Sequence, residues 1–322
     1  MKKVIGIGSA LVDILTRIDN DDTLHELNIA KGSMMLVDEK SSAIIENKLK
    51  NYESTMAPGG SAANTIHGLA KLGIESGFVS FVGDDELGKF FEDSMNSVGV
   101  KPLLSHTKTA SGTARTIISA DGERTFATNL GASLEMHEGI ITDEVFKDWE
   151  YCYLEGYLIA NRPLFKKAID TAKSNGCKVV LDLASFNVVE DNRDFLNELL
   201  PQIDIIFANE EEAKALTQKS AEESLHHIAE NVDIAVVKIG KRGSLIKRGE
   251  DVVQIGCNKI DVVDTTGAGD MYAAGFLYGL IKGYDLERCG TIGNHLAESI
   301  IQVVGAKMDE NRWREFKYLA QV

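Results

Sequence analysis

The stretch DTTGAGDMYAAGF, residues 264–276, places two glycines and a carboxylate directly before an apolar run of helical composition. Gly267 and Gly269 can take backbone angles that other residues avoid, and they let a ligand approach the main chain closely. With Ala268 between them, the free N–H groups of the first helical turn would form an anion hole that the helix dipole strengthens. Asp270 beside this hole could accept a hydroxyl proton during phosphoryl transfer. An acid in a first turn also simply complements the dipole, so the motif alone leaves both interpretations open.

Two other patterns imitate nucleotide-binding loops without completing them. GDDELGKF has the spacing of a phosphate loop, but Phe90 stands where Ser or Thr should bind magnesium. GIGSAL lacks the last glycine of the dinucleotide fingerprint, because that position is Leu11. The seven histidines show no metal-ligand spacing. A hydride-transfer enzyme and a transition-metal site are therefore disfavoured.

Alternating strands and helices must position these residues. The apolar runs KVIGIG, SGFVSFVG, CKVVLDL, IDIIFAN and DIAVVKIG predict strands buried on both faces of a sheet. Helical stretches such as SAANTIHGLAKLG and EEEAKALTQ separate them. We expect an α/β fold, a doubly wound, mostly parallel sheet with helices on both faces, as one domain over residues 1–322. Ligands of such sheets bind beyond the carboxyl ends of the strands.

Two insertions interrupt this rhythm, at about residues 14–38 and 108–131. The second contains TARTIISA and RTFATNL, which predict a β-hairpin turning at Asp121-Gly122. Both insertions lie in the N-terminal half of the chain. We therefore expect them to pair into a small β-sheet that forms a lid over the main domain.

Composition narrows the class of partner. The net charge of −15 disfavours nucleic acid and anionic membranes, so a phosphate must be held by backbone dipoles, a few bases or a metal ion. The four cysteines form no CxxC pair and are expected to be small buried hydrophobes in a reducing compartment. MKKVIGIGSALVDI is better explained as a first strand than as a signal peptide, and no run of 18 apolar residues occurs. We expect a cytoplasmic protein.

Several motifs together resemble the ribokinase-like (PfkB) family of carbohydrate and nucleoside kinases. DTTGAGDMYAAGF is similar to the C-terminal signature of that family, and PGGSAANTIHGLAKLG with FVGDDELG is similar to the N-terminal signature. NEEEAKAL, VVKIGKRGS, GIGSALVDI and GNHLAESIIQVVGA match further family segments. The motifs occur in the family order over essentially the whole chain.

The resemblance implies roles on the phosphate-donor side. Asp270 would be the catalytic base, and the anion hole would receive the transferred γ-phosphate of ATP. Asn209 and Glu212 would lie near the ATP phosphates, with Glu212 positioning Mg²⁺ through its water shell, although an Asn and an acid after a strand also make an ordinary helix cap. Lys238 stands where relatives often carry Thr. The other residues implied to border the nucleotide are Gly240, Gly243 and Asn294, the last near the adenine.

The resemblance also implies an acceptor side. A carboxylate at Asp13, which ends the first strand region, could accept two hydrogen bonds from a vicinal diol. Gly59 and Gly60 would let the backbone approach the acceptor, and Asn64 offers both a donor and an acceptor group. Asp264 either helps to bind a monovalent cation such as K⁺ or braces its loop.

The identity of the acceptor is the most open point. GGSAAN and DGERTFATNLGAS look more like adenosine-kinase relatives, so we expect a nucleoside 5′-hydroxyl, with adenosine first and a free sugar such as ribose or fructose second. Phe126 and Leu134 could cover a base, and Phe126 could equally belong to the lid core. An alternative that is not an enzyme is a ligand-binding regulator on the same fold. Such a protein should have lost the base or the anion hole, so the intact GAGD argues against it. The chain could act as a monomer or as a lid-mediated homodimer.

Overall fold

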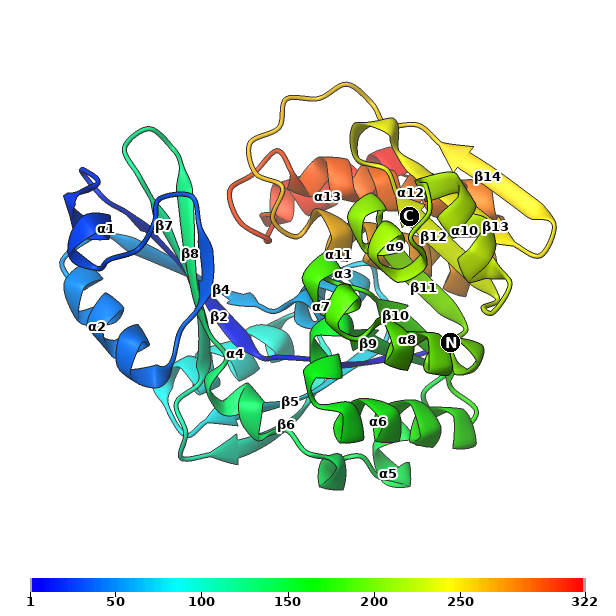
Figure 1. Ribbon diagram of the computed structural model, residues 1–322, viewed down its shortest axis with the longest axis horizontal. Coiled ribbons are helices and arrows are strands. Elements are labelled where there is room, and N and C mark those ends of the chain that lie inside the picture. The colour runs from blue at the N-terminus through cyan, green and yellow to red at the C-terminus, as the bar shows by residue number, and fades with distance from the viewer. Residues whose placement is uncertain (1, 321–322) are drawn as a thin grey trace.

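The computed structural model describes residues 2–320 and confirms the α/β class, with a large sheet between helices and a second, smaller sheet (Figure 1). Within these residues the large sheet has nine strands in the order β14-β13-β12-β11-β10-β9-β1-β5-β6. Neighbouring strands are parallel except for β12–β13 and β13–β14. The strands are β1 (Val4–Ile7), β5 (Ser76–Gly83), β6 (Val100–Thr107), β9 (Tyr151–Glu155), β10 (Lys178–Asp182), β11 (Ile205–Asn209), β12 (Ile234–Lys238), β13 (Ser244–Arg248) and β14 (Asp251–Ile255).

Helices cover both faces of the large sheet, which explains why its strands are continuously apolar. Successive side chains of a strand point to opposite faces, so Val4 packs into one core and Ile5 into the other. The first core includes α3 (Ser61–Lys71), α4 (Glu86–Ser97), α11 (Ala268–Lys282), α12 (Leu286–Ile300) and α13 (Glu310–Ala320). The second includes α5 (Asp143–Phe146), α6 (Arg162–Ser174), α7 (Phe186–Asp191), α8 (Arg193–Leu199), α9 (Glu210–Thr217) and α10 (Ala221–Ala229).

The strand order reverses at β1, which lies between β5 on one side and β9 on the other. At such a switch point the connections leave in opposite directions and open a crevice beyond the carboxyl ends of the strands. The last residues of β9, β10, β11 and β12 are all polar, namely Glu155, Asp182, Asn209 and Lys238. The topology therefore gathers these four side chains at one edge of the sheet.

The small sheet has the order β3-β8-β7-β2-β4. Its strands are β2 (Leu11–Arg17), β3 (Met34–Leu36), β4 (Ser54–Gly59), β7 (Gly112–Ile118) and β8 (Arg124–Asn129). β7 and β8 are antiparallel and turn through Gly122 at φ +88°, which confirms the predicted hairpin. Because β4 also belongs to it, the sheet draws on residues beyond the two predicted insertions.

One face of the small sheet carries its own core. α1 (Asp22–Glu26) and α2 (Glu39–Leu49) lie on the outer side of the strands in Figure 1. Leu24 and Ile45 from these helices pack with Ile117 and Ala127 of the hairpin. The opposite face of the small sheet does not contribute to this core.

Two observations concern the chain as a whole. No helix within residues 2–320 is long and apolar enough to cross a membrane. Cys152, Cys177 and Cys289 are buried, as expected, but Cys257 is exposed. The expectation was wrong for Cys257 because this residue follows β14 and lines a cavity.

Candidate active site

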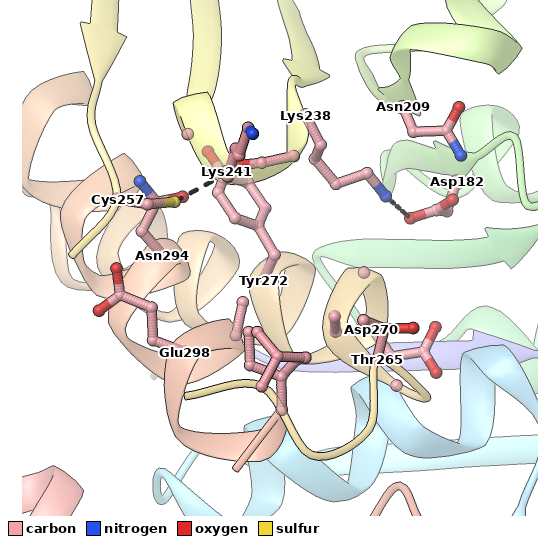
Figure 2. A pocket seen from close by; sticks show the side chains of 18 of the residues that line it. Asp182, Asn209, Lys238, Lys241, Cys257, Thr265, Asp270, Tyr272, Asn294 and Glu298 are labelled. Carbon is pink, nitrogen blue, oxygen red and sulfur yellow. Dashed lines mark hydrogen bonds and ion pairs between the residues drawn. The ribbon is translucent and has the colours of Figure 1, made fainter. Parts of the chain in front are cut away.

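A cavity of about 930 Å³ lies beyond the carboxyl ends of the parallel strands (Figure 2). Its wall combines the ends of β10, β11 and β12 with the first turn of α11 and part of α12. It brings together all the residues predicted for the donor side, namely Asn209, Glu212, Lys238, Gly240, Gly243, Gly267, Ala268, Gly269, Asp270 and Asn294.

The N-terminus of α11 is built as the glycine pattern predicts. Gly267 is the N-cap residue at φ +77°, and a Cβ added there would lie 2.9 Å from the Cβ of Ala306. The N–H of Ala268 donates to the carbonyl of Thr265 at 3.2 Å. The following N–H groups, those of Gly269 and Asp270, belong to the first turn, whose donors have no partner within a helix. This turn can therefore hold an anion in the cavity.

The carboxylate of Asp270 is held by two donors from α3. Ser61 donates to its Oδ1 at 2.7 Å, and the amide of Asn64 donates to its Oδ2 at 2.9 Å. Burial raises the pKa of Asp270 to about 6, and these two hydrogen bonds oppose the rise. A base that is ionised at neutral pH, with a pKa near the working pH, suits the removal of a hydroxyl proton.

The predicted acceptor residues do not line this cavity, although Asn64 contacts Asp270. Asp13 is in the middle of β2 in the small sheet, which corrects its placement at the end of the first strand, because the chain crosses from one sheet to the other at residues 8–10. Gly59 of β4 pairs with Leu11, and a Cβ there would collide with the Asp13 carboxylate. Gly60, at φ +99°, begins α3 against the carbonyl of Ser9. Both glycines are required by this close packing.

Asn209 and Glu212 form a complete capping box at the start of α9. The Asn209 side chain accepts from the Glu212 N–H at 2.8 Å, and its amide donates to the Glu212 carboxylate at 2.7 Å. Burial raises the pKa of Glu212 to about 7. The structure therefore confirms the helix cap, and the side chains of Asn209 and Glu212 also line the cavity.

Lys238 lies beside the anion hole. Its ammonium is 3.0 Å from the carboxylate of Asp182 (Figure 2), and a Cβ added at Gly269 would be 3.1 Å from its Nζ. The pKa of Lys238 is raised despite its burial, mainly by the charges of Asp182 and Glu212. The lysine therefore carries a full positive charge within the donor cavity.

The far end of the cavity is formed by the β12–β13 turn and α12. Gly243, at φ +96°, allows the turn to pass against the carbonyl of Ile255. The Asn294 amide donates to the Gly256 carbonyl at 3.0 Å. In Figure 2, Asn294 and Asp270 lie well apart among the residues that line the cavity.

Asp264 does not line the cavity and has several protein partners. Its carboxylate accepts from the Thr266 N–H at 3.0 Å and from the Gly305 N–H at 2.6 Å. It also forms an ion pair with Arg124 of β8. These contacts support the interpretation that Asp264 braces the loop before α11, and they tie that loop to the small sheet.

Four further residues contact residues of the site but were not predicted from the sequence: Ser61, Arg124, Asp182 and Lys307. Ser61 directly follows the double glycine, and Asp182 ends a predicted strand, so both carried a signal that could have been used. Lys307 Nζ lies 2.8 Å from the side-chain oxygen Oδ1 of Asn64, a residue 243 positions earlier in the chain. No local pattern marks Lys307 or Arg124.

Comparisons with known proteins find relatives of similar sequence and fold. The crystal structure of a probable sugar kinase from Rhizobium etli is 31% identical, with a TM-score of 0.88 over 100% of this chain and 99% of that one. The adenosine kinase from Sinorhizobium meliloti is 32% identical, with a TM-score of 0.87 over 99% of both chains. The 5-dehydro-2-deoxygluconokinase of Bacillus licheniformis is 30% identical over 271 residues, 76% of this chain and 80% of that protein.

A family model confirms the resemblance seen in the motifs. The pattern described as pfkB family carbohydrate kinase matches residues 27–312. The match contains α3, the capped strand end at Asn209 and the first turn of α11. This chain therefore belongs to the pfkB family of carbohydrate kinases and is a phosphotransferase.

Proposed function

We propose that this kinase transfers the γ-phosphate of ATP to the 5′-hydroxyl of a nucleoside, with adenosine as the first candidate. The observation that carries the choice of acceptor is the inner face of the small sheet. That face combines one carboxylate with a row of apolar side chains.

Strand register identifies the residues of this face. Asp13 pairs with Ala114, which pairs with Thr128 and then Leu36. Two residues further along the strand, Leu15 pairs with Thr116, which pairs with Phe126 and then Met34. Side chains paired across neighbouring strands lie on the same face, so Leu15, Phe126, Met34 and Leu36 share the face of Asp13. Phe126 is thus opposite the lid core, whose hairpin members are Ile117 and Ala127.

This face fits an acceptor that is polar at one end and flat and apolar at the other. Met34 and Leu36 are 73% and 74% exposed, and Leu15 and Phe126 are half-buried. A ribose diol can donate to Asp13 while an aromatic base lies against the apolar row. A free sugar carries hydroxyls on all sides and would leave this row without a matching surface.

The residues around Asp270 account for the proposed chemistry. The Asp270 carboxylate takes the proton of the acceptor hydroxyl, the hydroxyl oxygen bonds to the γ-phosphorus, and the bond to the β–γ bridging oxygen breaks to release ADP. The N–H groups of the α11 first turn and the Lys238 ammonium stabilise the charge on the transferred group. Removing one such backbone donor typically costs about 3 kcal/mol of transition-state stabilisation.

The donor cavity fits a magnesium nucleotide by its chemistry. Among the described residues, no group of three or more His, Cys, Asp or Glu side chains could hold a metal ion. Mg²⁺ commonly keeps several waters and binds through substrate phosphates with one or two carboxylates. Glu212, whose carboxylate is oriented by Asn209, is the residue that would contact this water shell, and the ion would supply charge neutralisation at the phosphates.

The acceptor and its class are tested by one turnover screen. Purified protein is given magnesium and ATP with adenosine, inosine, cytidine, ribose or fructose, and ADP release and the phosphorylated product are measured. We expect adenosine to be the best acceptor and to yield the 5′-monophosphate. A higher kcat/KM for ribose or fructose would overturn the nucleoside assignment and favour the sugar alternative, which the similarity to sugar kinases supports.

The apolar row is tested by substitution. Phe126→Ala should raise the KM for adenosine by about tenfold, because it removes most of the half-buried aromatic surface proposed to contact the base. Tyr318→Ala, which removes an aromatic ring that is 84% exposed on α13, is the matched control. An unchanged KM for adenosine in Phe126→Ala would place the base elsewhere.

A further inference from the structure

Lys307 is a charged side chain from a distant part of the chain that reaches the acceptor side of the site. It lies in the loop between α12 and α13, between Ala306 and Met308, whose side chains are almost fully buried. The Gly305 N–H of the same loop donates to Asp264, and Ala306 packs against Gly267. The loop is thus fastened to the α11 start at the point where Lys307 extends toward α3.

Lys307 completes a chain of hydrogen bonds that ends at the catalytic carboxylate. Its ammonium donates to Asn64 Oδ1 at 2.8 Å, and Asn64 Nδ2 donates to Asp270 Oδ2 at 2.9 Å. An ammonium group cannot accept a hydrogen bond, and an ionised carboxylate cannot donate one. The Asn64 amide can therefore satisfy both neighbours in one orientation only, with its NH₂ toward Asp270.

The charges around Lys307 reinforce this arrangement. The titratable groups that face it are Asp13 from β2, Asp270 from α11 and His67 from α3. Burial lowers the pKa of Lys307 to about 8, although Asp13 and Asp270 oppose the decrease. Burial raises the pKa of Asp13 to about 6, and the charge of Lys307 opposes that rise. The positive charge of Lys307 and the negative charges of Asp13 and Asp270 therefore stabilise one another's ionised forms.

We propose that Lys307 is a positioning residue for phosphoryl transfer, which orients the Asp270 carboxylate through Asn64 and keeps Asp13 in the ionised form that binds the acceptor. This inference rests on the proposed function of Asp270 and Asp13 and adds a third element to their site. It assigns a specific role to Lys307, which directly follows the family segment GNHLAESIIQVVGA and belongs to none of the quoted motifs.

The kinetic test compares three variants with the wild-type enzyme. Lys307→Met removes the charge and the donor while keeping a similar length, and we expect kcat to fall about tenfold or more, because small misplacements of a catalytic group are costly. Lys307→Arg keeps charge and donors and should recover part of the loss. Lys71→Met is the matched control, since Lys71 is the last residue of α3 but pairs with Glu310, away from the cavity. Its kcat should stay within twofold of wild type.

A second measurement does not depend on turnover. Carbon-13 NMR titration of the aspartate side chains, assigned with Asp13→Asn and Asp270→Asn, should show Asp13 titrating at higher pH in Lys307→Met than in wild type. The thermal midpoint of each variant shows that it is folded. Wild-type protein without kinase activity would refute the proposed function, whereas the titration would still test Lys307. An unshifted Asp13 titration, or a Lys307→Met kcat within twofold of wild type, would overturn the inference.

Discussion

Replacing Asp270 by Asn isolates the proposed base with little change of shape. The introduced side chain could still accept from the Asn64 amide through its carbonyl oxygen. Its NH₂ group would then face Ser61, whose hydroxyl now donates to the carboxylate at 2.7 Å and can turn to accept instead. Both partners stay satisfied, so we expect the variant to fold and to bind the acceptor.

The size of the effect follows from what the amide cannot do. It cannot take the hydroxyl proton, and a positioned base contributes about 10²–10⁴ in rate. At 1.36 kcal/mol per tenfold change, that corresponds to about 2.7–5.4 kcal/mol of activation free energy. The pKa of Asp270, raised to about 6 by burial, makes this carboxylate a stronger base than an exposed one, so we expect a loss no smaller than the lower end of that range.

The assay measures single-turnover phosphate transfer at saturating ATP and acceptor, together with acceptor binding by calorimetry. The rate for Asp270→Asn should fall by at least about 10², while the acceptor Kd stays within threefold of wild type. Asp251→Asn, the same substitution at an exposed position at the start of β14, should leave both quantities unchanged. A rate for Asp270→Asn within tenfold of wild type would show that another group removes the proton.

Three further results are expected. The kcat should rise with pH through about 6 to a plateau, because the ionised form of Asp270 accepts the proton and its pKa is raised from 3.8 to about 6; a flat profile from pH 5 to 7 would contradict this. Asp13→Asn should raise the acceptor KM about tenfold or more and change kcat less, since it removes a charged acceptor of hydrogen bonds; an equal effect on both would assign Asp13 another role. Arg124→Gln should increase ATP hydrolysis without acceptor relative to transfer, because it breaks the ion pair between the small sheet and Asp264; an unchanged ratio, measured by ADP release, would contradict it.

Much of the fold was predictable because local patterns determine it. The continuously apolar strands indicated burial on both faces, and the structure confirms helices on both sides of the large sheet. The Asp121-Gly122 turn indicated the hairpin. Less was predictable about the small sheet, because β4 joins it through pairing with β2 some forty residues earlier, and no local pattern encodes such a partner.

The residues of the candidate site also divide into those that local patterns predict and those that depend on tertiary contacts. The glycines and Asp270 could be assigned together because a helix start is a local structure, with its anion-binding groups within one turn. Asn209 and Glu212 could likewise be placed because a capping box spans four consecutive positions. Asp13 was assigned a role but misplaced, since the crossing of the chain between two sheets is a tertiary event.

The sequence by itself indicated the class of fold and the family, and it predicted the anion hole and the base, because each depends on residues a few positions apart or on motifs in a set order. Only the tertiary structure decided what surrounds that base. Ser61 and Asn64 reach Asp270 from α3, and Lys238 reaches the first turn of α11 from β12. Lys307 reaches Asn64 from the loop after α12. The face of the small sheet that carries Asp13 and Phe126 was also set by strand register. Burial then raised the pKa of the Asp270 carboxyl to about 6, and burial exists only once these segments have packed.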